Sequence, residues 1–177
     1  MKNCIRIRLA AFFPAFILIG CAGLPAISTN VSFCCTPQAA TLSTYRVEFE
    51  DMPEFLKPMM RDEASIVLDQ KGLQYTESSA QAILHMLFVA TPLEAEPRDN
   101  DAAWGTIEAG GTARFNAEVR MEFRNAVTRE VIWAGSMAKL HNVGPGAYMH
   151  EAPARRAVRE AMLVLFADYP MRAINKM

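Results

Sequence analysis

The sequence predicts an α+β fold: a single small domain in which an about four-stranded, mostly antiparallel sheet carries two helices packed on one face. Three observations support this class. The 177 residues leave room for one domain and an appendage. Apolar residues make up 51% of the chain and charged residues 21%, which suffices for a core and excludes a disordered protein. Segments with a period of two alternate with segments of helical period.

The first half of the domain contains a strand, a helix and a second strand. Residues 45–50 alternate apolar and charged side chains, which predicts a strand. A helix is expected over 53–71, with Asp51 as its cap, Pro58 inside about the first turn and Lys71-Gly72 at its end. A short extended piece at 73–75 and an apolar strand at 83–90 follow.

The second half begins with the clearest periodicity of the chain. Residues 114–124 alternate strictly, which predicts a strand with one buried and one wet face. A turn at 125–129 and a partner strand from 130 to about 140 complete an antiparallel hairpin. A final helix begins near Glu151 and ends before Pro170.

The chain outside this domain divides into three parts. Residues 1–20 have the cationic start and short apolar run of a secretory signal. Residues 21–43 contain two prolines, several Ser and Thr and almost no charge, which predicts a flexible tether that could reach about 70 Å. The α+β domain is expected over 44–171, and residues 172–177 form a C-terminal tail.

The signal ends in Leu18-Ile19-Gly20-Cys21, which resembles the lipobox of bacterial lipoproteins. The resemblance implies cleavage before Cys21, a diacylglycerol thioether on its thiol and acylation of the new amino terminus. Two alternatives are an ordinary cleaved signal with an incidental cysteine and a membrane-buried N-terminal anchor. Since several acyl chains hold a protein to a membrane stably, the mature protein is expected to be membrane-bound through its anchor.

The residue after the cysteine and the net charge bear on location. In the lipoproteins that this motif resembles, an aspartate after the cysteine favours retention at the inner membrane. This chain has Ala22 at that position, so the resemblance implies a location in the outer membrane, facing the periplasm. Loss of Lys2, Arg6 and Arg8 with the signal leaves 15 basic against 19 acidic residues. With this excess of acidic residues, the mature chain has no net positive charge to attract nucleic acid or anionic lipid headgroups.

The four cysteines predict no disulfide within the mature chain. Cys4 leaves with the signal, Cys21 is expected to be lipidated, and Cys34 and Cys35 are neighbours that rarely bond to each other. The pair is expected to be incidental. The alternative is an intermolecular disulfide or a metal or redox pair, although neither a histidine nor a third cysteine lies nearby to complete a zinc site.

The candidate contact residues are Trp104 and three arginines. Trp104 lies in a long polar stretch at 91–111, a loop length that is often functional. Acidic residues of the same stretch lack the spacing and turn glycine of an EF-hand loop, so no metal site is predicted. Arg155, Arg156 and Arg159 oppose the dipole at the start of the last helix. They either contact a partner or pair locally with acidic residues of the same helix.

Three motifs are similar to those of the small periplasmic lipoproteins grouped as a domain of unknown function. They are Lys71-Gly72-Leu73-Gln74-Tyr75, Val131-Ile132-Trp133-Ala134-Gly135 and the closing Tyr169-Pro170. The resemblance covers about residues 45–170 and implies the same fold. It supplies no catalytic residues.

The sequence lacks the motifs of the common enzyme classes. The sequence holds no G-x-S-x-G, H-E-x-x-H, C-x-x-C or Walker loop, and its histidines, His85, His141 and His150, lie in three different elements. A non-catalytic protein without cofactor or metal is therefore expected, acting in envelope assembly, export or maintenance through contacts with an unidentified envelope protein. The alternative is a binding module for a lipid, glycan or small ligand.

Overall fold

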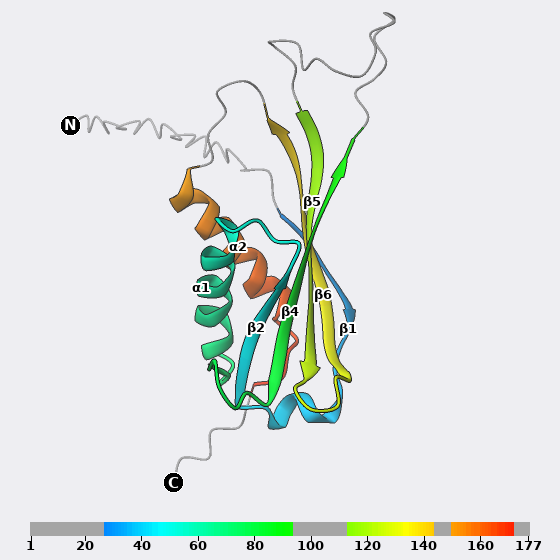
Figure 1. Ribbon diagram of the computed structural model, residues 1–177, viewed down its shortest axis with the longest axis vertical. Helices are drawn as coiled ribbons and strands as arrows, with labels where there is room; N and C mark the ends of the chain where they lie inside the picture. Colours follow the sequence, from blue (N-terminus) through cyan, green and yellow to red (C-terminus); the bar gives the residue numbers. More distant parts are fainter. Residues whose placement is uncertain (1–26, 94–112, 144–149, 172–177) are drawn as a thin grey trace, which may run out of the picture.

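The computed structural model describes residues 27–93, 113–143 and 150–171, which form a six-stranded sheet and two helices (Figure 1). The strands are β1 (Ser28–Phe33), β2 (Thr44–Glu50), β3 (Gln74–Tyr75), β4 (Ala82–Pro92), β5 (Ala113–Asn125) and β6 (Val131–Val143). The helices are α1 (Leu56–Asp69) and α2 (Glu151–Leu165), and Pro37–Thr41 form a 3₁₀ turn. The α+β class and the single domain are confirmed.

The sheet is mixed, with the strand order β1-β6-β5-β4-β2-β3. The pairs β1–β6, β6–β5 and β5–β4 are antiparallel, whereas β2 runs parallel to both β4 and β3. Parallel neighbours need a crossover, and α1 supplies it between β2 and the two strands that follow. The predicted hairpin is confirmed as β5 and β6.

The sheet has six strands rather than about four, because the short extended piece at 73–75 joins it as β3 and because β1 lies in the predicted tether. Ser28–Phe33 pair with β6, and Ala39 of the 3₁₀ turn is buried in the core. Composition misled the interpretation, since Ser, Thr and Asn are also tolerated in an exposed edge strand. The chain between Cys21 and the first described strand is therefore six residues long, Ala22 to Ile27.

The same segment corrects the interpretation of the two neighbouring cysteines. Cys34 and Cys35 are joined by a disulfide, where the sequence predicts an incidental, unbonded pair. They follow β1 directly in described chain rather than in a tether. Cys35 is half-buried and packs against the core.

The first helix is shorter than the predicted 53–71. Asp51 is not its cap: the residue has a positive φ of 53°, and the N-cap position is Phe55. Pro58 lies in the first turn, where its missing N–H leaves no helical bond unmade. Gly72 has a φ of 83°, so the predicted glycine that terminates the helix is confirmed.

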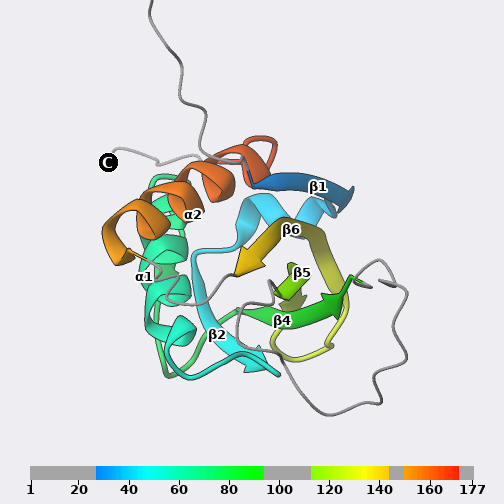
Figure 2. The same ribbon diagram turned by 90° about the horizontal axis from the view of Figure 1, so that it is seen from above.

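Both helices lie on one side of the sheet and pack against each other (Figures 1 and 2). Beneath them an aromatic cluster fills the core, with Trp133 and Phe166 ring centroids 4.6 Å apart and Phe123 and Tyr169 centroids 5.2 Å apart. β4, β5 and β6 continue beyond the helix layer (Figure 1). The sheet therefore has a covered inner face, an uncovered outer face and a projecting end.

Candidate functional site

Two of the residues singled out from the sequence lie outside the described residues. These are Cys21, the expected lipidation site, and Trp104, the expected contact in the 91–111 stretch. Most of that stretch lies outside them too, because the described chain stops at Leu93 and resumes at Ala113. The three arginines of the last helix are all described.

Arg155 and Arg159 meet a buried carboxylate of the other helix. Glu63 of α1 is 1% exposed, and its Oε2 accepts a hydrogen bond from Arg159 Nε at 2.6 Å. Arg155 Nη1 lies 3.4 Å from the other oxygen of Glu63 and 3.2 Å from Asp62. Arg155 Nε also donates a hydrogen bond to Glu151 Oε1 at 2.9 Å. This contact is the local pairing that the sequence offered as one of two alternatives. The contacts give both arginines a role in joining α1 to α2.

The pKa values of the two guanidinium groups follow from these bonds. The hydrogen bond that Arg159 donates to Glu63 raises the pKa of Arg159, and the bond that Arg155 donates to Glu151 is the largest cause that raises the pKa of Arg155. Both groups therefore stay charged. Arg156, between them in sequence, is exposed on α2.

Sequence reasoning missed Glu63, although a signal was present. Met60, Ala64 and Val67 form the apolar stripe of α1, and Glu63 lies on that stripe. A carboxylate is almost never buried without a partner. Its position therefore pointed to a cation on the facing element, and the only described elements rich in arginine are α2 and β5.

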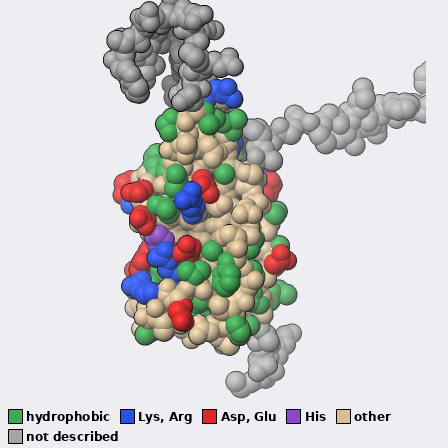
Figure 3. Space-filling view, turned by 90° about the vertical axis from the view of Figure 1, so that its right-hand side faces the viewer, with side chains coloured by type: hydrophobic (Ala, Val, Ile, Leu, Met, Phe, Trp, Pro, Cys, Tyr) green, Lys and Arg blue, Asp and Glu red, His purple; other side chains and the backbone are tan. Residues whose placement is uncertain are grey.

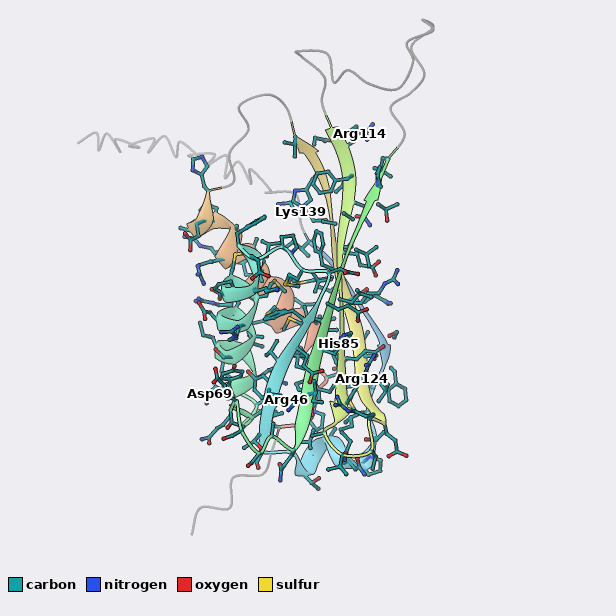
Figure 4. The ribbon with its side chains drawn as sticks, in the orientation of Figure 1. Arg46, Asp69, His85, Arg114, Arg124 and Lys139 are labelled. Carbon is teal, nitrogen blue, oxygen red and sulfur yellow. A yellow bond between two sulfur atoms is a disulfide. The ribbon has the colours of Figure 1, made fainter. Side chains whose placement is uncertain are left out.

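The uncovered outer face of the sheet carries charges in neutralising pairs (Figures 3 and 4). Along β2 and β5 the pairs are Arg46–Glu48, Arg120–Glu118 and Arg124–Glu122, at 2.6, 3.1 and 2.7 Å. The hydrogen bond that Arg120 donates to Glu118 raises the pKa of Arg120. The face is balanced in sign, as the sequence predicts for a solvated sheet face, and has no single-sign patch to steer a polyanion.

His85 lies within this balanced face rather than in a catalytic arrangement. Its register neighbours are Glu48 on β2 and Glu122 on β5, and its Nε2 lies 2.8 Å from Glu50 Oε2. The side chain is 14% exposed, and Figure 4 shows it above Arg46 and Arg124 in that view. None of the described contacts joins it to a nucleophile.

His141 and His150 lie in other parts of the fold. His141 on β6 stacks on Phe115 of β5, with ring centroids 5.0 Å apart and planes 8° apart. Burial and then the nearby charge of Lys139 lower the pKa of His141, so the ring is mostly neutral at pH 7. His150 is exposed at the N-cap of α2. The structure does not bring the three histidines together.

The open edge of the sheet is the feature most suited to binding another chain. β1 ends the sheet, and five of its six residues are exposed. Among the described residues, its backbone bonds only to β6. Its sequence, Ser28-Thr29-Asn30-Val31-Ser32-Phe33, holds no charge and no proline, the devices that usually protect an edge. A register shift between Val31 and Phe33 interrupts the pairing only at the C-terminal end of β1.

Other candidate sites in the described part of the chain are weak. A shallow depression, open to solvent, is lined by Thr36–Gln38 and Glu130–Ile132. No group of three His, Cys, Asp or Glu side chains placed to hold a metal occurs within 27–93, 113–143 and 150–171. In the same ranges, neither helix has the length and apolar character needed to cross a bilayer.

Comparison with known proteins gives a distant likeness of fold. No protein-family model matches the chain, and no curated protein matches it. A PelC dodecamer from Paraburkholderia phytofirmans is 9% identical, with a TM-score of 0.47 over 82% of this chain and 99% of that one. A minor lipoprotein from Acinetobacter baumannii is 7% identical, with a TM-score of 0.42 over 73% of this chain and 95% of that one.

A third solved structure extends the same distant likeness. A Xanthomonas campestris protein of the family DUF330 is 8% identical, with a TM-score of 0.34 over 68% of this chain and 77% of that one. At these values the comparisons concern the arrangement of helices and strands alone.

Proposed function

We propose that this protein is a lipid-anchored component of the outer membrane that faces the periplasm and works without catalysis, by binding an extended segment of another envelope protein. The open β1 edge carries the proposal. Its exposed backbone offers a row of donors and acceptors to an incoming strand.

The edge would recognise a partner strand through its backbone and its apolar side chains rather than through charge. β1 has no charged side chain, so it neither repels nor selects a partner by charge. Val31 and Phe33 are 37% and 44% exposed, and they offer apolar contacts for alternate side chains of the added strand. Backbone bonds would provide affinity, and these two contacts would provide selectivity.

The anchor supports the same assignment. The lipobox ends at Cys21, and β1 begins only seven positions later, so the edge and the anchor belong to one short stretch of chain. A partner bound along β1 would be held beside the membrane. The non-catalytic assignment follows from the absence of the common enzyme motifs in the sequence and from the separate positions of the three histidines.

The test is site-specific photocrosslinking in cells with a crosslinking amino acid at Asn30. Val164, which is 63% exposed on α2, is the matched control position. We expect one defined adduct from Asn30, absent from Val164, that falls at least several-fold when Val31→Lys is added to place a charge on the edge. A Val31→Ser variant should retain the adduct. Equal adducts from both positions, or no loss with Val31→Lys, would contradict edge binding.

The binding of a lipid, glycan or small ligand remains the second reading of the sequence. The shallow depression beside Val131 is too open to desolvate such a ligand on most of its surface, as binding pockets do. No specific observation within the described residues favours this alternative.

A further inference from the structure

The projecting end of the sheet exposes apolar side chains on both of its faces, with polar side chains among them. Beyond the level of Val119, the inner face presents Ala90, Pro92 and Phe115 beside Lys139 and His141, and the outer face presents Val89 and Leu140 beside Thr91, Arg114, Asn116 and Asn142. Leu93, Leu140 and Val143 are 39%, 45% and 38% exposed. A strand that faces water on one side and a core on the other alternates polar with apolar side chains. β5 alternates in that way to its end, whereas the end of β4 is apolar on both faces except at Thr91, and β6 places Leu140 on the outer face and Lys139 on the inner one. The ends of β4 and β6 therefore depart from the pattern of a strand with one wet face, which indicates apolar surroundings for them.

The short link to Cys21 limits where a membrane could lie. Ser28 pairs with Ala138, five residues before the described end of β6 at Val143. At about 3.3 Å per residue, the projecting end extends about 17 Å beyond Ser28. Seven steps of chain from Ser28 to Cys21 reach at most about 23 Å. The link is thus long enough for this end to touch the bilayer that carries the anchor.

The opposite end of the sheet does not meet this condition. The turn after β5 includes Val127, which is 89% exposed and lies beyond Val131, the first residue of β6. Val131 lies seven residues from Ala138 on β6, or about 23 Å below Ser28. A fully extended link would reach no farther than the level of Val131, so the turn at Val127 could not touch the bilayer that carries the anchor.

We propose that the projecting ends of β4, β5 and β6 lie against the membrane, with Leu93, Leu140 and Val143 in contact with lipid. The proposal rests on the lipid anchor of the proposed function. It places the strands upright, with the turn at Val127 about 40 Å from the bilayer, and leaves the β1 edge running away from the membrane toward the periplasm.

Apolar contact, rather than charge, carries this orientation. Arg114 and Lys139 lie on the projecting end, but the connection at 94–112, outside the described residues, adds five acidic residues and one arginine to the sequence. The net charge of this region does not attract anionic headgroups. The orientation is therefore expected in vesicles with or without anionic lipid.

The test uses the full-length acylated protein on phosphatidylethanolamine–phosphatidylglycerol vesicles that contain a nitroxide-labelled phosphatidylcholine. A fluorophore is attached to Leu140→Cys or, as the control at the far end, to Val127→Cys. The native cysteines do not interfere, because Cys34 and Cys35 are bonded to each other and Cys21 is acylated. Leu93→Cys replaces Leu140→Cys if that variant does not fold.

We expect nitroxide lipid to quench the probe at Leu140 at least several-fold more than the probe at Val127. Equal quenching of the two probes in protein that is acylated and floats with the vesicles would overturn the membrane contact and leave the anchor intact. Protein that is neither acylated nor able to float would overturn the proposed function together with this inference. The two failures are therefore distinguishable.

Discussion

Glu63 Oε2 on α1 accepts a hydrogen bond from Arg159 Nε on α2 at 2.6 Å, and this carboxylate is 1% exposed. The two helices are thus joined through a charged contact at the edge of an apolar interface. A buried carboxylate is tolerated only with such partners, since its desolvation is costly. Two of the three arginines that oppose the α2 dipole, Arg155 and Arg159, are explained by this requirement.

Removal of Arg159 should destabilise the domain, whereas removal of Arg156 should not. Arg159→Ala leaves Glu63 buried with only the longer 3.4 Å contact to Arg155, while Arg156→Ala removes an exposed side chain. We expect a clear fall in Tm for the first variant and almost none for the second, measured by circular dichroism. Equal Tm values would show that the Glu63 contact contributes nothing to stability.

A neutral residue at position 63 should have a smaller effect than loss of both arginines. Glu63→Gln keeps the shape of the side chain and removes the buried charge, so we expect a loss of about 1–3 kcal/mol. The Arg155→Ala/Arg159→Ala variant keeps that charge without a partner on α2. Urea unfolding at pH 7 ranks the variants, and greater loss from Glu63→Gln would contradict the account.

Gly135 should not tolerate even a methyl group. A Cβ at this position of β6 would lie 2.9 Å from Leu165 Cδ1 on α2 and 3.0 Å from the backbone oxygen of Asn30 on β1. The leucine can move, but the oxygen belongs to a paired strand. We expect Gly135→Ala to cost about 1–3 kcal/mol, as overpacking usually does. Ser136→Ala, on the opposite face of β6, is the control and should remain close to wild type in urea unfolding.

Two buried tyrosines should respond differently to loss of their hydroxyl groups. Tyr169 Oη donates to the Ala39 carbonyl oxygen at 3.4 Å, so Tyr169→Phe should cost about 1 kcal/mol. Tyr45 Oη is buried without a hydrogen-bond partner in the described part of the chain, so Tyr45→Phe should be neutral or slightly stabilising. Chemical denaturation of the two variants checks the order, and the reverse order would contradict these contacts.

The same tyrosines predict a loss of stability at alkaline pH. Burial, with smaller effects of Tyr75 and Asp69, raises the pKa of Tyr45 well above its usual value, and burial raises that of Tyr169. Above about pH 10 the unfolded chain loses these protons first, so unfolding is favoured as the pH rises. The loss should approach about 1.4 kcal/mol per pH unit for each tyrosine. In the Tyr45→Phe/Tyr169→Phe variant, the fall in unfolding free energy between pH 9.5 and 11.5 should be much smaller.

The elements with a regular pattern could be predicted from the sequence. The strict alternation over 114–124 and the helical stripe before Gly72 both correspond to observed elements, because burial on one face imposes a period on the side chains. β1 has no such period, since most of its residues are exposed on both faces. Its pairing with β6 arises from tertiary structure, which composition alone does not reveal.

The contacts of the candidate sites also differ in how far the sequence could predict them. The pairing of Arg155 with Glu151 is local and was predictable as one alternative, whereas the contact with Glu63 joins residues 92 positions apart. The open edge was hidden because its segment resembled a tether. Its value as a binding surface depends on its place at the end of the sheet, and strand order is not encoded in any short motif.

The lipid anchor is the central claim, because the proposed position of the β1 edge beside the membrane depends on it. The direct measurement is metabolic labelling of wild type and Cys21→Ser with radioactive palmitate, followed by flotation of outer and inner membranes from the same cells. The account predicts label and outer-membrane flotation for wild type, and the loss of both in Cys21→Ser without a change in Tm of the domain. An unlabelled wild type, or a Cys21→Ser variant that floats as the wild type does, would contradict it.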